Sequence, residues 1–455
     1  MKTPSDILTF RISKALSFFA VLFCLLFSSP FFAGAQSSPT KPDTLDNKSF
    51  VNWAKGHAFT LKNTDNAVGY NDLLPIKKMI GNARVVAVGE AAHGMHEPQA
   101  FRNRLFKYLV EECGFTTIVV EAGLAESTLA NTFVLTGKGS PQIAAKNLTI
   151  GNASSENIEL MQWMRKYNLS PAHKNKLKFL GMDVEIIGYP GDTIARHLAI
   201  DTVLNYLKKV DSEALAKIST ALLPYINRLS AARYPALTQI EHGQLTAILE
   251  GMTALIEFQR INYLEKSSQD EYEWVHRLAI AAQQTERIAR LTPQDQSGGV
   301  PPDAWMASDA RDAAMAANVI WILNNRANGK VLLYSHNAHV KNAPTTGSVW
   351  SAFAQAPNTV GQYLKSILGK DYFIVGTSFA PSVAAAQPGS VDLALLDVGK
   401  PRFIVSLKEA SINPRVKNWL AVKRPMEANI HFFFNLQIGT AFDALLFLGK
   451  SSPAK

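Results

Sequence analysis

Two short β-branched segments separated by one helix constrain the fold of this chain more than any other feature. Residues 83–88 (ARVVAV) and 115–120 (FTTIVV) are typical of buried strands. Residues 98–113 between them favour a helix, because Pro98 suits a first helical turn and Gly114 suits the position just after the last turn. This order of elements predicts a βαβ unit, and the two strands of such a unit run parallel.

Further segments of the same kind extend the predicted sheet. Four more candidate strands are residues 177–182, 330–335, 372–376 and 444–448. Residues at about 190–305 instead carry apolar side chains at three- and four-residue spacing, which is typical of amphipathic helices. The sequence therefore predicts an α/β fold, with a parallel-sheet core flanked by helices and a mostly helical inserted subdomain.

Composition excludes several classes of protein. The chain has 455 residues, 47% of them hydrophobic and 18% charged, which fits a globular protein and excludes a disordered one. Its formal net charge is +9, but no run of Lys or Arg stands out, so we expect no nucleic-acid partner. Two cysteines are too few for a disulfide scaffold or a thiolate zinc site.

The first 35 residues have the pattern of a secretory signal peptide. Three basic residues precede the apolar run 15–27, and Ala33-Gly34-Ala35 follows as a small-residue cleavage site. The run is shorter than the roughly 20 residues that span a bilayer. We therefore expect cleavage, a mature domain at 36–455 that is periplasmic or secreted, and no membrane anchor afterwards. Only Cys113 would remain, so no intrachain disulfide is expected.

Polar side chains end four of the predicted strands. These are Glu90, Glu121, Asp183 and His336. In parallel α/β sheets, ligands bind beyond the carboxyl ends of the strands. Strand ends are often polar simply because a loop begins there, but four ionisable ends at one edge favour a functional site.

His93 lies three residues after Glu90, in a loop with glycines at 89 and 94. This spacing allows the carboxylate to orient an imidazole that acts as a base. Arg102 falls on the apolar stripe of the helix 98–113, so it needs a buried partner, for which Glu90 and Glu121 are the natural candidates.

His336 and His339 follow the strand 330–335 at a spacing that is also compatible with a divalent metal. No HExxH motif supports that alternative, however. The sequence also contains no G-x-S-x-G elbow and no phosphate-binding loop of the P-loop or GxGxxG type, so a serine hydrolase of the usual α/β kind is not supported.

These motifs resemble those of the erythromycin esterase family. The resemblance spans most of the mature chain and is weakest in the helical insert. It rests on GEAAHG at 89–94, ECGF at 112–115, VEAG at 120–123, WMRKYN at 163–168, GMD at 181–183, RD and MAAN within 311–318, HNAH at 336–339 and FDAL at 442–445.

The resemblance implies a hydrolase that cleaves an ester or a macrolide lactone with a water activated by His93, without a metal or other cofactor. The residues implied in catalysis with His93 are Glu90, Glu121, Arg102 and His336, and we expect Asp183 and His339 to contact the substrate. The expected partner is a small-molecule ester, and we expect a monomer. Two alternatives stay open: a metal-dependent hydrolase that uses the same Glu and His residues, and a non-catalytic exported ligand-binding protein.

Overall fold

The protein is seen in a computed structural model, which describes residues 46–65, 69–148, 154–185, 197–293, 301–380, 387–429 and 432–454. The expected signal peptide, residues 1–35, lies outside these residues. In the described part of the chain, no helix is both long enough and apolar enough to cross a membrane.

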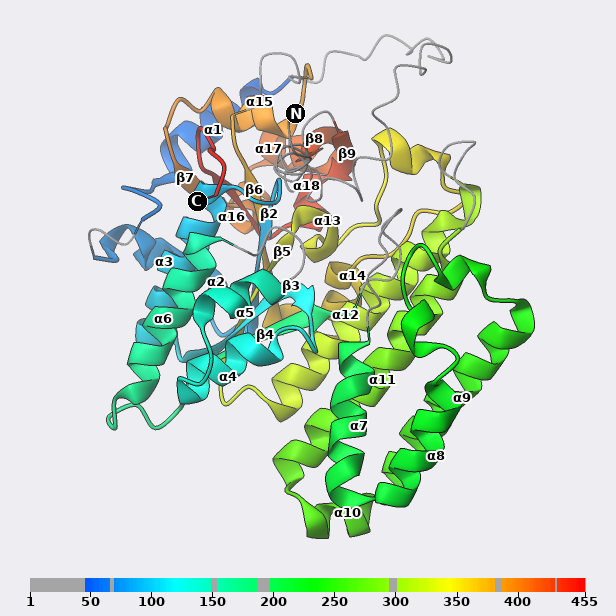
Figure 1. The fold of residues 1–455 in the computed structure, drawn as a ribbon. Coiled ribbons are helices and arrows are strands. Elements are labelled where there is room, and N and C mark those ends of the chain that lie inside the picture. The colour runs from blue at the N-terminus through cyan, green and yellow to red at the C-terminus, as the bar shows by residue number, and fades with distance from the viewer. Residues whose placement is uncertain are drawn as a thin grey trace, which may run out of the picture. The chain divides into compact units, whose positions relative to one another are not determined.

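An eight-stranded sheet forms the centre of the fold (Figure 1). The strands from β10 to β4 pair in parallel, which confirms the predicted parallel core. The edge beyond β10 is antiparallel, and this feature was not predicted. In sheet order the strands are β1 (Phe59–Thr60), β7 (Phe403–Ser406), β10 (Ala444–Phe447), β6 (Tyr372–Ser378), β2 (Val85–Glu90), β5 (Lys330–His336), β3 (Phe115–Gly123) and β4 (Lys178–Asp183).

Helices cover both faces of the sheet, as the apolar sequence of its inner strands requires. In β2, Val86 and Val88 pack on one face against α2, α3, α4 and α6. Val85 and Ala87 pack on the opposite face, against the layer that contains α1, α12 and α14. The bounds of these helices are α1 (Lys48–His57), α2 (Leu74–Ile80), α3 (His96–Cys113), α4 (Thr128–Thr136), α5 (Pro141–Asn147), α6 (Ser155–Leu169), α12 (Trp305–Asn325) and α14 (Val360–Leu368).

The predicted helical insert is present between β4 and α12. Its helix α11 packs against α7, α9 and α12, so the insert joins the hydrophobic core that includes the α12 face of the sheet. Side-chain caps define several of its helix starts, including a capping box of Thr238 and Glu241 at α9. Its helices are α7 (Leu198–Val210), α8 (Ser212–Leu222), α9 (Gln239–Phe258), α10 (Arg260–Lys266) and α11 (Gln269–Leu291).

A two-stranded hairpin, β8 (Lys423–Asn429) and β9 (Phe432–Gln437), lies outside the main sheet and was not predicted. Phe434 of this hairpin stacks on Trp350, with ring centroids 5.0 Å apart. The Phe434 ring also makes an edge contact with the ring of His336. The hairpin therefore supplies an aromatic wall beside the end of β5. The remaining α-helices are α13 (Asn337–Val340), α15 (Val391–Leu396), α16 (Leu407–Ala410), α17 (Pro414–Ala421) and α18 (Ile438–Ala441).

A bulge near the end of β3 determines where its polar side chain lies. The register between β3 and β4 shifts between Val120 and Gly123, so Glu121 sits inside the bulge. Bulges often re-aim a side chain next to a functional site. The neighbouring strand accommodates the bulge with Gly181, because a Cβ there would collide with the backbone carbonyl oxygens of Ala122 and Gly123.

We predict that Gly181→Ala destabilises the protein by about 1–3 kcal/mol, the usual cost of overpacking a core. The matched control is Gly251→Ala in α9, where a Cβ meets no atom within 4 Å. A helical glycine replaced by alanine gains about 0.5–1 kcal/mol. Chemical denaturation of both variants tests this prediction, and equal stability of the two would contradict it.

Candidate active site

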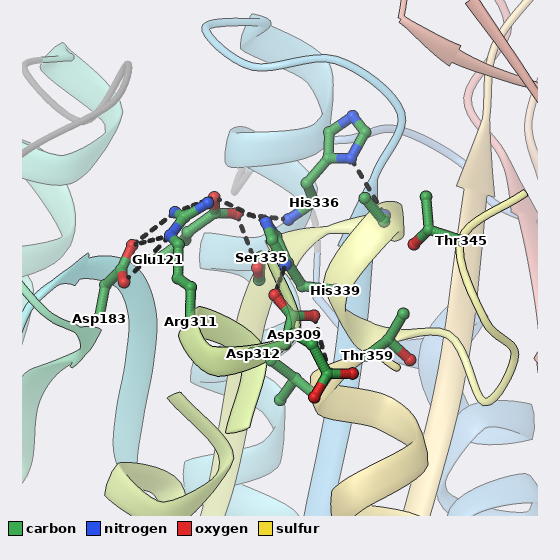
Figure 2. A network of polar contacts seen from close by, with 12 residues as sticks. Glu121, Asp183, Asp309, Arg311, Asp312, Ser335, His336, His339, Thr345 and Thr359 are labelled. Carbon is green, nitrogen blue, oxygen red and sulfur yellow. Dashed lines mark hydrogen bonds and ion pairs between the residues drawn. The ribbon is translucent and has the colours of Figure 1, made fainter. Parts of the chain in front are cut away.

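The four polar strand ends meet at one edge of the sheet, as the sequence predicts. Strands β2, β5, β3 and β4 are consecutive neighbours and run parallel. Glu90 and His336 are direct register partners, and Asp183 pairs with Gly123 at the end of β3. Figure 2 shows the polar network that forms there.

Glu121 is the centre of this network (Figure 2). Its Oε2 accepts hydrogen bonds from the Ser335 hydroxyl at 2.7 Å and from the backbone N–H of His336 at 2.9 Å. Its Oε1 lies 3.2 Å from Arg311 Nη2 and 3.3 Å from His339 Nε2. Burial alone would raise the pKa of Glu121, but the cations around it hold that pKa well below its usual range. The buried carboxylate therefore stays ionised.

Asp183 is held by the same arginine. Its carboxylate receives both Nε and Nη2 of Arg311, with the shortest contact at 2.5 Å. Asp183 is completely buried. It precedes the helical insert in the sequence, whereas Arg311 belongs to α12, which follows the insert. One guanidinium therefore neutralises two buried carboxylates on adjacent strands, and it fixes α12 against β3 and β4.

His93 is oriented by Glu90. Its Nδ1 donates to Glu90 Oε1 at 2.6 Å, and the other Glu90 oxygen accepts the hydroxyl of Tyr334. Its Nε2 is 4.0 Å from Glu121 Oε1, beyond hydrogen-bond distance, and has no hydrogen-bond partner within the described ranges. Burial lowers the pKa of His93, but the charges of Glu121 and Glu90 outweigh it and raise that pKa above 6.5.

His336 has a different environment, because both of its ring nitrogens already have backbone partners. Its Nδ1 accepts from the N–H of Ala338 at 3.0 Å, so its Nε2 carries the proton and donates to the carbonyl of Ala91 at 3.1 Å. Figure 2 shows the ring turned away from Glu121. Burial and the nearby charge of His93 lower the pKa of His336 to about 3, which keeps the ring neutral.

His339 lies between two carboxylates. Its Nδ1 donates to Asp312 Oδ1 at 2.8 Å, and its Nε2 faces Glu121. Although burial lowers its pKa, the charges of Asp312 and Glu121 raise the pKa of His339 to about 9. Asp312 also accepts the N–H of Val360 at the start of α14. The pKa values of the three histidines at this edge are therefore shifted in different ways, and a pKa of about 9 keeps His339 protonated at neutral pH.

The predicted ion pair between Arg102 and a carboxylate is wrong. Arg102 is fully buried, as expected, but its Nε and Nη2 donate to Asn103 Oδ1 and its guanidinium lies over the ring of Tyr334 at 4.7 Å. Its Nη1 has no hydrogen-bond partner within the described segments. Arg102 therefore packs on Tyr334, whose hydroxyl binds Glu90, and Arg311 is the cation that pairs with the buried carboxylates.

The site contains residues whose positions the sequence pattern did not indicate. Tyr334 and Ser335 lie within a predicted strand, and their polar groups could not be assigned to a face without the register of β5 against β2 and β3. Arg311 and Asp312 belong to a motif of the family resemblance, but nothing in their sequence pattern indicates which residues they contact. For the metal alternative, within the described ranges no three His, Cys, Asp or Glu side chains are placed to hold one ion.

Comparison with known proteins agrees with this architecture. The sequence model of the erythromycin esterase family matches residues 110–451, which include Glu121, Asp183, Arg311, His336 and His339. Erythromycin esterase type II of Escherichia coli is 30% identical over 348 residues, covering 74% of this chain and 79% of that protein. The chain is thus a hydrolase of the class that acts on esters, and it belongs to the erythromycin esterase family.

Solved structures show the same fold. A Bacillus cereus protein of known crystal structure is 28% identical in sequence and superposes with a TM-score of 0.76. The match covers 90% of this chain and 98% of the Bacillus cereus chain. The erythromycin esterase EreC, as a mutant in its open conformation, has a TM-score of 0.64 at 15% identity, with 85% of this chain and 96% of that one covered.

We predict that Arg311→Met lowers the free energy of unfolding by about 3–5 kcal/mol, because it leaves two buried carboxylates without their shared cation. The control is Lys217→Met, which removes a solvent-exposed ion pair with Glu213 on α8. Such pairs contribute little, so its stability should match that of the wild type. A denaturation midpoint for Arg311→Met equal to that of the control would contradict the role given to Arg311.

Proposed function

We propose that this protein is an exported hydrolase that cleaves a carboxylic ester, or a macrolide lactone, with a water molecule activated by His93. The observation that carries the proposal is the His93–Glu90 pair. Glu90 occupies Nδ1 of the ring, and this leaves the lone pair of Nε2 as the basic site. A carboxylate that orients an imidazole in this way is a recurring arrangement in general-base catalysis.

In the proposed reaction, Nε2 of neutral His93 removes a proton from water as the water oxygen attacks the ester carbonyl carbon. The C–O bond of the ester then breaks, and the imidazolium returns its proton to the departing alkoxide. The products are a carboxylic acid and an alcohol, and His93 is regenerated. Glu90 holds the ring and stabilises its positive charge between the two proton transfers.

The negative oxygen of the tetrahedral intermediate needs a positive group in a dry site. In the proposal His339 supplies this positive charge through space, because both of its N–H groups already face carboxylates. Its Nε2 lies 3.3 Å from Glu121 Oε1, the same oxygen that lies 4.0 Å from His93 Nε2. His336 and Arg102, both expected from the resemblance to take part in catalysis, already contact other protein groups, and these contacts favour a supporting role. Asp183 acts through Arg311.

Two parts of the proposal depend on other observations. The signal-like pattern of residues 1–35 supports export to the periplasm or the medium. A macrolide lactone is favoured as the substrate by similarity to the type II erythromycin esterase. Simple aryl esters are the complementary test compounds, since the same water attack would cleave them.

We predict that hydrolysis by the wild type falls as the pH drops through the raised pKa of His93. The base is the neutral ring, so activity is present above that pKa and lost below it, with the inflection above 6.5. His93→Asn should lose roughly 10²–10⁴ in rate, the usual contribution of a general base. Glu90→Gln removes a charge that raises this pKa, so its acidic limb should shift to lower pH with a smaller loss of rate.

The matched control is His276→Asn, in which the altered histidine pairs with Glu257 on the insert. It should keep the rate and pH profile of the wild type. The rates are measured with the mature chain on a panel of macrolides and aryl esters. Full activity of His93→Asn would remove this histidine from the reaction, and no turnover of any ester by the wild type would contradict the proposed activity.

Metal removal tests the remaining alternative. We predict that dialysis against EDTA leaves the rate of ester hydrolysis unchanged, because the proposed base and electrostatic groups are all protein side chains. The control is a chelated sample with Zn²⁺ or Mn²⁺ added back. Loss of activity on chelation, with recovery on adding a metal, would contradict this prediction and would indicate that the Glu and His residues act in a metal-dependent mechanism.

A further inference from the structure

We infer that residues 451–454 form a strap that fixes the loop carrying His93, and that Glu97 is the positioning residue on which the strap closes. This inference rests on the proposed role of His93 as the base. The strap, residues 451–454, and the loop, residues 91–95, lie at opposite ends of the described domain in sequence. In Figure 1 the end of the chain, marked C, lies beside the region where α3 begins.

The side chain of Glu97 receives hydrogen bonds from two strap residues. Its Oε2 accepts the Ser451 hydroxyl at 3.0 Å and the backbone N–H of Ser452 at 2.6 Å. Its Oε1 accepts the Ser452 hydroxyl at 2.9 Å. Burial raises the pKa of Glu97, but these hydrogen bonds outweigh it and lower the pKa below its usual value. The contact is therefore made by an ionised carboxylate.

Backbone contacts extend the pairing along the loop. The N–H of Ala454 donates to the carbonyl of Gly94 at 2.7 Å, and the N–H of His96 donates to the carbonyl of Ser452 at 2.7 Å. Met95 and Pro453 form an antiparallel bridge between these two bonds. The strap thus pairs with the residues that directly follow His93.

The loop needs this external support for two reasons. Gly94, the residue after His93, has φ = +68°, and the space that a Cβ would occupy there holds no atom within 4 Å, so Gly94 has no side chain of its own to hold the loop in place. In addition, Met95 at the N-cap of α3 makes no side-chain capping bond. The first turn of a helix leaves N–H groups unsatisfied. The Ser452 carbonyl takes one of them and acts as the missing cap.

The consequence concerns the geometry of the base. The loop runs from Glu90 at the end of β2 to His96 at the start of α3. Within it, His93 is the side chain that a charged group, Glu90, holds in place. Small misplacement of a catalytic group costs rate without preventing substrate binding. Loss of the strap should therefore lower kcat more than it changes KM.

The test uses the full mature chain with Glu97→Ala, Glu97→Gln and, as a second type of variant, deletion of residues 451–455. The control is Glu112→Gln on the same helix, at an exposed ion pair with Lys77. We expect kcat to fall at least tenfold in Glu97→Ala and in the deletion, with KM within about twofold. Glu97→Gln, which keeps an acceptor oxygen for Ser452, should retain more activity than Glu97→Ala.

Hydrogen exchange separates this inference from the proposed function. Amides of residues 91–97 should exchange faster in Glu97→Ala and in the deletion, while those of α7 keep the wild-type rate. If the wild type hydrolyses no ester, the proposed function fails, and exchange alone decides whether the strap fixes the loop. Unchanged exchange at 91–97 in both variants would overturn the inference, as would wild-type kcat in both.

Discussion

One buried carboxylate, that of Glu121, determines how the rest of the site is arranged. It is ionised and about 5% exposed, so it must be neutralised by groups within a few ångströms. The β3 bulge turns it toward β5, Ser335 and the backbone of His336 fix one oxygen, and Arg311 and His339 face the other. Elements far apart in sequence therefore meet at this side chain, and each of them brings one part of the proposed chemistry.

Three histidines near Glu121 have three different environments, although the charge of Glu121 raises the pKa of each of them. His339 touches Glu121 and a second carboxylate and becomes a stable cation, whereas His336 is enclosed by backbone groups and stays neutral. His93 has one nitrogen on Glu90 and the other facing Glu121 without a hydrogen bond, and its pKa is raised. Environments that push the pKa values of neighbouring groups apart are the physical basis for assigning acid and base roles.

The parallel core and the clustering of the four strand ends could be predicted, because both follow from local apolar runs and from the geometry of parallel sheets. The cation that pairs with the buried carboxylates could not be predicted. Arg311 is 128 residues from Asp183, on a helix whose pattern looks like any other, and Arg102 met the same sequence criterion but turned out to lie over Tyr334. The strap was equally unpredictable, since Ser451 and Ser452 carry no pattern that points to Glu97. Helical periodicity shows which side chains are buried, whereas the pairing of buried charges depends on long-range packing.

The central claim is that burial and the charges around Glu121 shift the pKa values of the three histidines in different ways, and ¹⁵N NMR of the imidazole rings across a pH titration measures this directly. The account predicts that at pH 7 His336 is neutral with its proton on Nε2, and that His339 carries both ring protons until about pH 9. His93 should titrate above 6.5. Three histidines that titrate together near pH 6.5, or a neutral His339 at pH 7, would contradict it.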